Sequence, residues 1–564
     1  MKIKRVIIVL LQLLLLLACF GIVYLLGVLT PKHPDREPTG STAIIEETQI
    51  ETPSNADWET AGDEESRANE ADSEDGGQDG QTQESASDGK NGRKYGRKYG
   101  RSKTDRAWTD RGQREAAGDL EAEPEKPYDP PRIMLASDLH YMSRTTHDDG
   151  TAFQKMLEGD DGKASQYSDE MIDALLTEAL EQKPTALVLS GDITLNGERE
   201  NHVYLAEKLH NLQEAGVQVV VIPGNHDINN KDAATYFGTK RTEAEYLESG
   251  EDFLELYHEF GYDQSPSRDP ASLSYMYPLD ATHWLLMLDS CQYEDRNHVE
   301  GRLKPETLAW LEAHLKLAGE HGIQILPIAH HNLLSESRLY TTQCTLENGE
   351  TVRELLEKYQ TPLYISGHLH AQRIKRYQPA PGLGGADYNI SEIVLSPYSI
   401  APNQYGWLSW NLDGGMKFET RSVDVAAYAA ARGSENPELL KFDTWSEHFL
   451  KNVIRGQISK KIELVPLELG ERMAELYADL YYDYCAGNAM SRDRLQTASI
   501  YKVWERVAPK GIYTAQMQAM IKDVVKDQHD WEYHWNDETQ EHETQEDETG
   551  EQKKDADDRP DTAG

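Results

Sequence analysis

VVVIPGNHDINN, residues Val219–Asn230, is the stretch around which the chain can be organised. Its first four residues are apolar and β-branched, which predicts a buried strand, and Pro223-Gly224 predicts a turn directly after it. The trio Asn225-His226-Asp227 follows, so an amide, an imidazole and a carboxylate stand where a strand ends. In open α/β sheets, ligands bind at strand ends. Asn and Asp are also ordinary turn residues, so the trio gains meaning only if other strands end in matching chemistry.

Four further predicted strands do end in such side chains. These apolar segments cover residues 133–137, 186–190, 323–329 and 362–366. Helical spacing between the segments predicts parallel βαβ units. The residues after the four strands are Asp138-Leu139-His140, Gly191-Asp192, His330-His331-Asn332 and Gly367-His368-Leu369-His370. A lone Asp at a strand end is usually a turn or cap residue, but the ends of neighbouring strands converge in space. The sequence therefore predicts one site built from all five ends.

The side chains at these five ends suit one kind of chemistry. Carboxylates and neutral imidazoles are ligands of intermediate divalent metals, and the lack of thiolates argues against a structural cysteine-type zinc site. So many nitrogen and oxygen ligands exceed what one such ion can use. Two ions about 3.5–4 Å apart, joined by a bridging carboxylate, would use them, and such a pair suits displacement at phosphorus.

The five motifs, in this order, resemble the calcineurin-like metallophosphoesterase superfamily over residues 131–425. The resemblance implies an α/β fold, in which two mixed β-sheets form a sandwich flanked by helices. It also implies a phosphoric ester hydrolase with a dinuclear centre of Mn, Fe or Zn, in which metal-bound hydroxide attacks phosphorus. A phosphodiester substrate is preferred over a phosphomonoester, although the motifs do not separate the two.

The resemblance also implies a role for each residue. The metal ligands form two groups that share one bridging carboxylate: Asp138, His140 and His370 for one ion, Asn225, His330 and His368 for the other, and Asp192 for both. His226 would contact the phosphoryl oxygen or protonate the leaving group, and Asp227 would orient His226. His331 stands beside His330, and spacing alone does not exclude it as a ligand.

Residues 1–31 predict a membrane anchor. Basic residues at positions 2, 4 and 5 precede an uncharged apolar run from Val6 to Leu29, which is long enough to cross about 30 Å of hydrocarbon. Basic residues before the run favour an orientation that places the catalytic domain outside the cytoplasm, as in a membrane-anchored bacterial member of the superfamily. Two alternatives remain: a cleaved signal peptide, whose apolar region is normally shorter, and lipid attachment at Cys19.

The formal net charge of the 564-residue chain is -41, and the acidity is concentrated outside the predicted catalytic domain. This balance argues against a nucleic-acid-binding surface, because phosphate binding needs clustered Lys and Arg. Residues 32–130 predict a disordered acidic linker. Its basic patch GRKYGRKYGRSK, residues 92–103, predicts either contact with an anionic cell-envelope polymer or a solvated linker. The four cysteines predict no disulfide framework.

The sequence also predicts the structure of three segments within and after the catalytic domain. The polar stretch 144–168 predicts a loop near the mouth of the site, and residues 388–425 predict successive antiparallel strands. Residues 426–530 have helical spacing and predict an α-helical region, followed by a disordered acidic tail over 531–564. One alternative function stays open, an envelope binding or scaffold protein on a decayed catalytic site. The presence of every implied ligand argues against decay.

Overall fold

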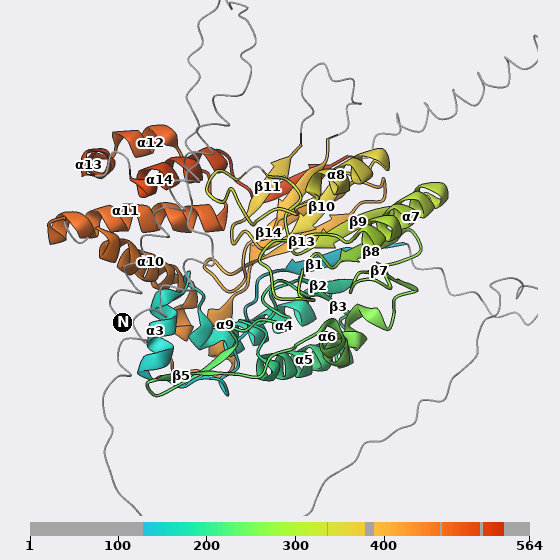
Figure 1. Ribbon diagram of the computed structural model, residues 1–564, viewed down its shortest axis with the longest axis horizontal. Helices are drawn as coiled ribbons and strands as arrows, with labels where there is room; N and C mark the ends of the chain where they lie inside the picture. Colours follow the sequence, from blue (N-terminus) through green and yellow to red (C-terminus); the bar gives the residue numbers. More distant parts are fainter. Residues whose placement is uncertain (1–127, 336, 378–388, 463–464, 508–510, 535–564) are drawn as a thin grey trace, which may run out of the picture. The chain divides into compact units, whose positions relative to one another are not determined.

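A computed structural model describes residues 128–335, 337–377, 389–462, 465–507 and 511–534 (Figure 1). The predicted anchor, the linker up to residue 127 with its basic patch, and the tail from residue 535 lie outside these ranges. Within the ranges, no helix combines the length and the apolar character needed to cross a membrane.

The first sheet contains six strands in the order β15-β14-β13-β1-β2-β3. Its parallel half consists of β1 (Arg132–Ala136), β2 (Ala186–Ser190) and β3 (Val219–Ile222). Its antiparallel half consists of β13 (Gln404–Trp410), β14 (Met416–Ser422) and β15 (Asp530–Tyr533). The predicted helices between the parallel strands are α4 (Ser168–Gln182) and α5 (Arg199–Glu214). The VVVI stretch therefore forms a fully buried strand at one edge of this sheet.

The second sheet contains seven strands in the order β11-β12-β10-β9-β8-β7-β6. The strands are β6 (Ser267–Arg268), β7 (Tyr275–Pro278), β8 (His283–Leu288), β9 (Gln324–Ala329), β10 (Leu363–Ser366), β11 (Arg373–Arg376) and β12 (Ser391–Val394). Helices α7 (Pro305–His321) and α8 (Gly349–Lys358) flank it (Figure 1). The antiparallel prediction for residues 388–425 is confirmed for β13 and β14. It holds only in part for β12, which joins the second sheet, antiparallel to β11 and parallel to β10.

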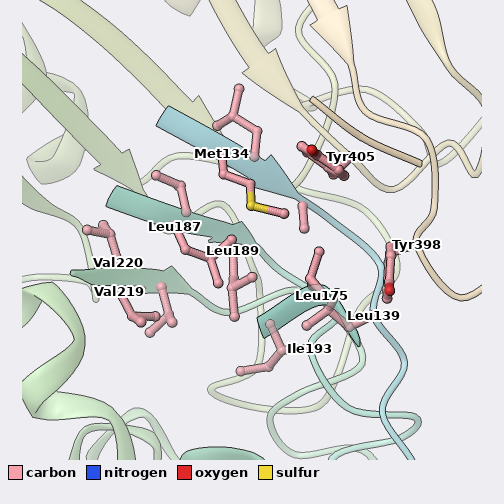
Figure 2. Close-up of a cluster of buried hydrophobic side chains, with 14 of the residues drawn as sticks. Met134, Leu139, Leu175, Leu187, Leu189, Ile193, Val219, Val220, Tyr398 and Tyr405 are labelled. Atoms are coloured by element: carbon pink, nitrogen blue, oxygen red, sulfur yellow. The ribbon is translucent and has the colours of Figure 1, made fainter. Parts of the chain in front are cut away.

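The main hydrophobic core draws side chains from both sheets and from the helices that flank them. Figure 2 shows part of it, with Leu187 and Leu189 of β2 and Leu175 of α4 among its members. Leu139 and Ile193 belong to the same cluster and directly follow two predicted metal ligands. The loops that carry those ligands are therefore fixed to the core. The two sheets and their flanking helices confirm the predicted two-sheet α/β architecture.

The predicted loop over residues 144–168 is wrong in part, because it contains helix α3 (Thr151–Gly159). Three apolar residues, Ala152, Phe153 and Leu157, give this helix one buried side in an otherwise polar stretch. They pack in a small cluster with the hairpin of β4 (Ala234–Phe237) and β5 (Lys240–Glu243). The helix after this hairpin, α6 (Gly250–Tyr257), begins at a capping box between Ser249 and Asp252.

The predicted helical region at the C-terminal end is confirmed. It contains α9 (Val425–Ala431), α10 (Phe442–Lys461), α11 (Leu467–Ala486), α12 (Arg492–Thr497), α13 (Ser499–Val507) and α14 (Ile512–Asp523). The last four of these surround a second hydrophobic core together with α10. The predicted disordered tail is wrong at its start, because β15 pairs with β14 and Trp531 is buried in the main core.

Candidate metal centre

The five strand-end motifs converge, and all seven predicted ligands are buried. Among the described residues, two groups of carboxylates and imidazoles bring their ligand atoms within 4.8 Å of one another. One group is Asp138, His140, Asp192 and His370, and the other is Asp192, His330 and His368. Asp192 thus belongs to both groups, as a bridging carboxylate would.

The distances within the site are those of groups arranged around shared cations. Oδ2 of Asp192 lies 3.1 Å from Nε2 of His330 and 3.8 Å from Nε2 of His140. Nε2 of His370 lies 3.1 Å from Nε2 of His140 and 3.3 Å from Oδ1 of Asp138. The amide oxygen of Asn225 lies 3.2 Å from Nε2 of His330, which places Asn225 beside the second group.

The backbone at the site adopts a conformation that most residues avoid. Five of the ligand-bearing residues have φ between 40° and 66°: Asp138, His140, Asp192, His368 and His370. Each such residue costs on the order of 1–3 kcal/mol and persists only where its surroundings enforce it. Gly224 packs closely against this backbone, since a Cβ atom there would collide with the backbone nitrogen of Asp192. The fold therefore holds these side chains at the site against a local backbone preference.

The electrostatics of the site favour a bound cation. Burial opposes the ionisation of Asp192, but the charges of His330 and His226 outweigh it and hold the pKa of Asp192 well below its usual value. Burial likewise opposes the charged form of His330, but Asp192 raises the pKa of His330 to about 9. For His370 the nearby carboxylates, Asp161 first, overcome burial and raise its pKa to about 10. Divalent ions would take the place of these protons, so the residues fit a pair of metals.

His226 lies beside the two groups but is less buried than the ligands. Its backbone N–H donates to Oδ1 of Asp192 at 2.8 Å, and its ring stands perpendicular to that of His140, with centroids 4.8 Å apart. Its Nδ1 lies 2.8 Å from the carbonyl oxygen of Leu195 and 2.9 Å from Oδ1 of Asn196. These two oxygens fix the tilt of the ring.

Asp227 binds the backbone on both sides of this part of the site. The carboxylate of Asp227 accepts hydrogen bonds from the backbone N–H groups of Ile193, Thr194 and Gly224 and from the hydroxyl of Thr194. It therefore joins the loop after β2 to the loop after β3. The contacts with Nδ1 of His226 come from Leu195 and Asn196, and the orientation of His226 by Asp227 stays a prediction.

His331 is engaged elsewhere. Its Nδ1 lies 2.8 Å from the hydroxyl of Ser290, and its Nε2 lies 2.9 Å from the carbonyl oxygen of Val299. Among the described residues, His331 is a member of neither group of ligands.

Two contacts behind the ligands escaped the sequence prediction. Nδ1 of His370 donates to Oδ2 of Asp161 at 2.6 Å, and Nε2 of His368 lies 2.9 Å from the carbonyl oxygen of Gln343. Asp161 lies in the polar stretch predicted as a loop near the mouth, and nothing in its local pattern separates it from the other acidic residues there. Every residue type carries a backbone carbonyl, so the contact made by Gln343 could not be predicted from the sequence.

Two segments of the chain match families of known proteins. Residues 131–372 match the calcineurin-like phosphoesterase family, and residues 424–527 match the C-terminal domain of cyclic nucleotide phosphodiesterase. The chain is 30% identical over 202 residues to glycerophosphodiester phosphodiesterase GpdQ of Enterobacter lignolyticus, covering 36% of this chain and 61% of that protein. It is 22% identical over 188 residues to a probable cyclic nucleotide phosphodiesterase of Xenorhabdus bovienii, covering 33% of this chain and 62% of that protein.

Each match therefore spans less than two thirds of the curated relative. Among solved structures, a dimetal phosphatase from Danio rerio is similar with a TM-score of 0.39 and 15% identity. That similarity covers 52% of this chain and 97% of the zebrafish chain.

Proposed function

Residues 131–372 form a calcineurin-like phosphoesterase domain, and from this premise we propose that the chain hydrolyses phosphate esters with the help of two divalent metal ions. The observation that carries the proposal is the position of Asp192, which is shared by two buried groups of ligands and hydrogen-bonded to the backbone of His226. Mn, Fe and Zn all suit this mixture of carboxylate and imidazole ligands.

The residues around the ligands supply the remaining chemistry. Bound in the two groups, divalent ions would neutralise the charge of the phosphoryl group and activate the attacking water. A carbonyl oxygen only accepts hydrogen bonds, so the contact with Leu195 places a proton on Nδ1 of His226. Nε2 of His226 is then the atom that would contact the phosphoryl oxygen or protonate the leaving group.

Phosphodiesters are the substrate class that we favour over phosphomonoesters. Both curated relatives carry the name of a phosphodiesterase. The helical region adds an independent argument, because residues 424–527 match a domain described from cyclic nucleotide phosphodiesterase.

The location of the enzyme is proposed from the sequence. Residues 1–31 would anchor the chain in the membrane with the catalytic domain outside the cytoplasm. The basic patch at residues 92–103 would then meet anionic polymers of the cell envelope. Membrane fractionation combined with mass spectrometry of the mature N-terminus would distinguish an intact anchor from cleavage or from lipid attachment at Cys19.

The test of activity uses the full-length protein in mild detergent. Metal-free protein is reconstituted with Mn²⁺ and assayed on bis-p-nitrophenyl phosphate and on p-nitrophenyl phosphate. We expect hydrolysis that requires the metal and is faster for the diester. A lack of metal-dependent turnover across a broad panel of phosphate esters would instead favour the alternative of a decayed site with a binding or scaffold role.

A further inference from the structure

The segment that carries the last two ligands lies between the metal centre and the helical region. Within Gly367–His370, which we call the GHLH motif, His368 and His370 belong to the metal-binding groups. The residues that follow each of them, Leu369 and Ala371, are 2% and 0% exposed and belong to the hydrophobic core of the helical region. The next residue, Gln372, donates its backbone N–H to the carbonyl oxygen of Cys485 in α11 at 3.0 Å. The motif is thus packed directly against residues 424–527.

The ring of His370 is held from behind by Asp161. The 2.6 Å contact between Nδ1 of His370 and Oδ2 of Asp161 turns Nε2 toward Asp138 and His140. Lys163 lies 2.8 Å from the other oxygen of Asp161 and 2.9 Å from Asp160. This buried ammonium group therefore pairs with the same carboxylate that accepts from His370.

Helix α10 supports the turn that carries Asp161. Nε2 of Gln457 donates to the carbonyl oxygens of Glu158 and Asp160 at 3.2 and 2.7 Å. Gly162 has a φ of +100°, and a Cβ atom at this position would collide with the side chain of Leu450. The turn therefore fits closely against α10 and takes its position from that helix.

The ring of His368 is contacted by a segment that is bound to a different helix, α14. Its Nε2 contacts the carbonyl oxygen of Gln343, whose φ is 64°. The segment before Gln343 is fixed to α14, because the carboxylate of Asp523 accepts from the backbone N–H groups of Arg338 and Leu339 at 2.9 and 3.3 Å. Helix α14 thus supports His368 through the segment that ends in Gln343, as α10 supports His370 through Asp161.

We propose that the helical region is a positioning element of the metal centre, which fixes the rings of both GHLH histidines through Asp161 and Gln343. The inference rests on the proposed dinuclear centre and assigns a task to residues 424–527. Groups that hydrogen-bond to the far nitrogen of a metal-bound imidazole set its orientation and basicity, and losing one typically weakens metal binding by about 10–100-fold.

The test measures Mn²⁺ binding to the metal-free full-length protein by electron paramagnetic resonance, without reference to turnover. Asp161→Asn keeps the size of the side chain and removes its charge. We expect one of the two Mn²⁺ sites to weaken by about 10–100-fold, while the other changes by less than about threefold. The matched control is Asp149→Asn, which changes an exposed carboxylate of the same polar stretch and should leave both sites near their wild-type affinity.

A second variant separates positioning from loss of folding. Gln457→Ala lies in α10, far along the chain from every ligand, and should weaken the same Mn²⁺ site as Asp161→Asn. Arg455→Ala, at an exposed position of the same helix, is its control, and thermal unfolding of all variants is recorded in parallel. If Asp161→Asn proves unfolded, Gln457→Ala decides the matter.

Wild-type affinity at both sites in Asp161→Asn and Gln457→Ala would overturn the inference. Failure of the unmodified protein to bind two Mn²⁺ ions would be a different result, because it would refute the proposed dinuclear centre itself.

Discussion

Oδ1 of Asp192 accepts a hydrogen bond from the backbone N–H of His226 at 2.8 Å. The second oxygen of the same carboxylate, Oδ2, faces the imidazoles of His330 and His140. One side chain therefore joins the proposed metal ligands to the residue proposed to act on the leaving group. Substitutions on the two sides of this hydrogen bond should have separable effects.

Asp192→Asn should impair the binding of both metal ions, because it removes the only carboxylate that the two groups of ligands share. We expect kcat/KM on bis-p-nitrophenyl phosphate to fall by more than about 100-fold, since a shared ligand should matter more than an outer contact worth 10–100-fold. Mn²⁺ stoichiometry measured on the same preparation should fall with it. Full activity at low Mn²⁺ concentration would contradict the shared position of Asp192.

His226→Ala should leave metal binding intact and reduce kcat, because His226 is not a member of either group of ligands. A general acid typically contributes about 10²–10⁴-fold to the rate. That contribution should be largest for an alkyl phosphodiester, whose leaving group needs a proton, and small for a p-nitrophenyl ester. Equal losses on both substrates would argue that His226 binds the phosphoryl group and does not protonate the leaving group.

Glu392→Gln should destabilise the fold. Glu392 is fully buried, accepts the backbone N–H groups of Leu333 and Leu334 at 2.7 Å each, and lies 3.5 Å from the buried ammonium of Lys375. Leaving one charge of a buried pair unpaired costs about 3–5 kcal/mol, and urea unfolding would measure it. Glu312→Gln breaks the exposed pair with Lys358 and should leave the unfolding midpoint in place.

Trp531→Ala should lower the free energy of unfolding and so show that the strand after the helical region stabilises the fold. The indole of Trp531 is 4% exposed and packs in the main core, while β15 pairs with β14. Truncating a buried Trp costs about 3–5 kcal/mol of unfolding free energy. Leu412→Ala, at a position that is 79% exposed, should change it by less than about 0.5 kcal/mol. Equal stability of the two variants would mean that β15 is a dispensable addition to the sheet.

The sequence was most informative where burial and chemistry coincide. The segment 186–190 coincides with β2 because all five of its residues are buried, so its apolar pattern is uninterrupted. The metal ligands could be predicted because each lies within a few residues of a strand end. The strands belong to both sheets, with β1, β2 and β3 in the first and β9 and β10 in the second. The alternation of such strands with helices predicted parallel βαβ units, while the sandwich of two sheets was implied by the resemblance to the superfamily.

Structure that depends on a few residues was harder to predict. Helix α3 buries only Ala152, Phe153 and Leu157, which is too sparse a pattern among polar residues to indicate a helix. Strand β15 has the sequence DWEY before an acidic stretch, so a single buried Trp was its main signal. Asp161 and Asn196 act on the site through contacts with His370 and His226 that only the three-dimensional arrangement reveals.

Because β15 belongs to the first sheet, this sheet can form completely only after almost the whole described chain has been synthesised. β1 and β15 belong to one six-stranded sheet, yet the sequence between them contains the whole second sheet and every helix of the described chain. On the ribosome, the sheet that presents Asp138 and Asp192 would lack its outermost strand until the helical region had also been synthesised. The two segments that match separate families, 131–372 and 424–527, should therefore mature together, and expression of either one alone should yield an unfinished molecule.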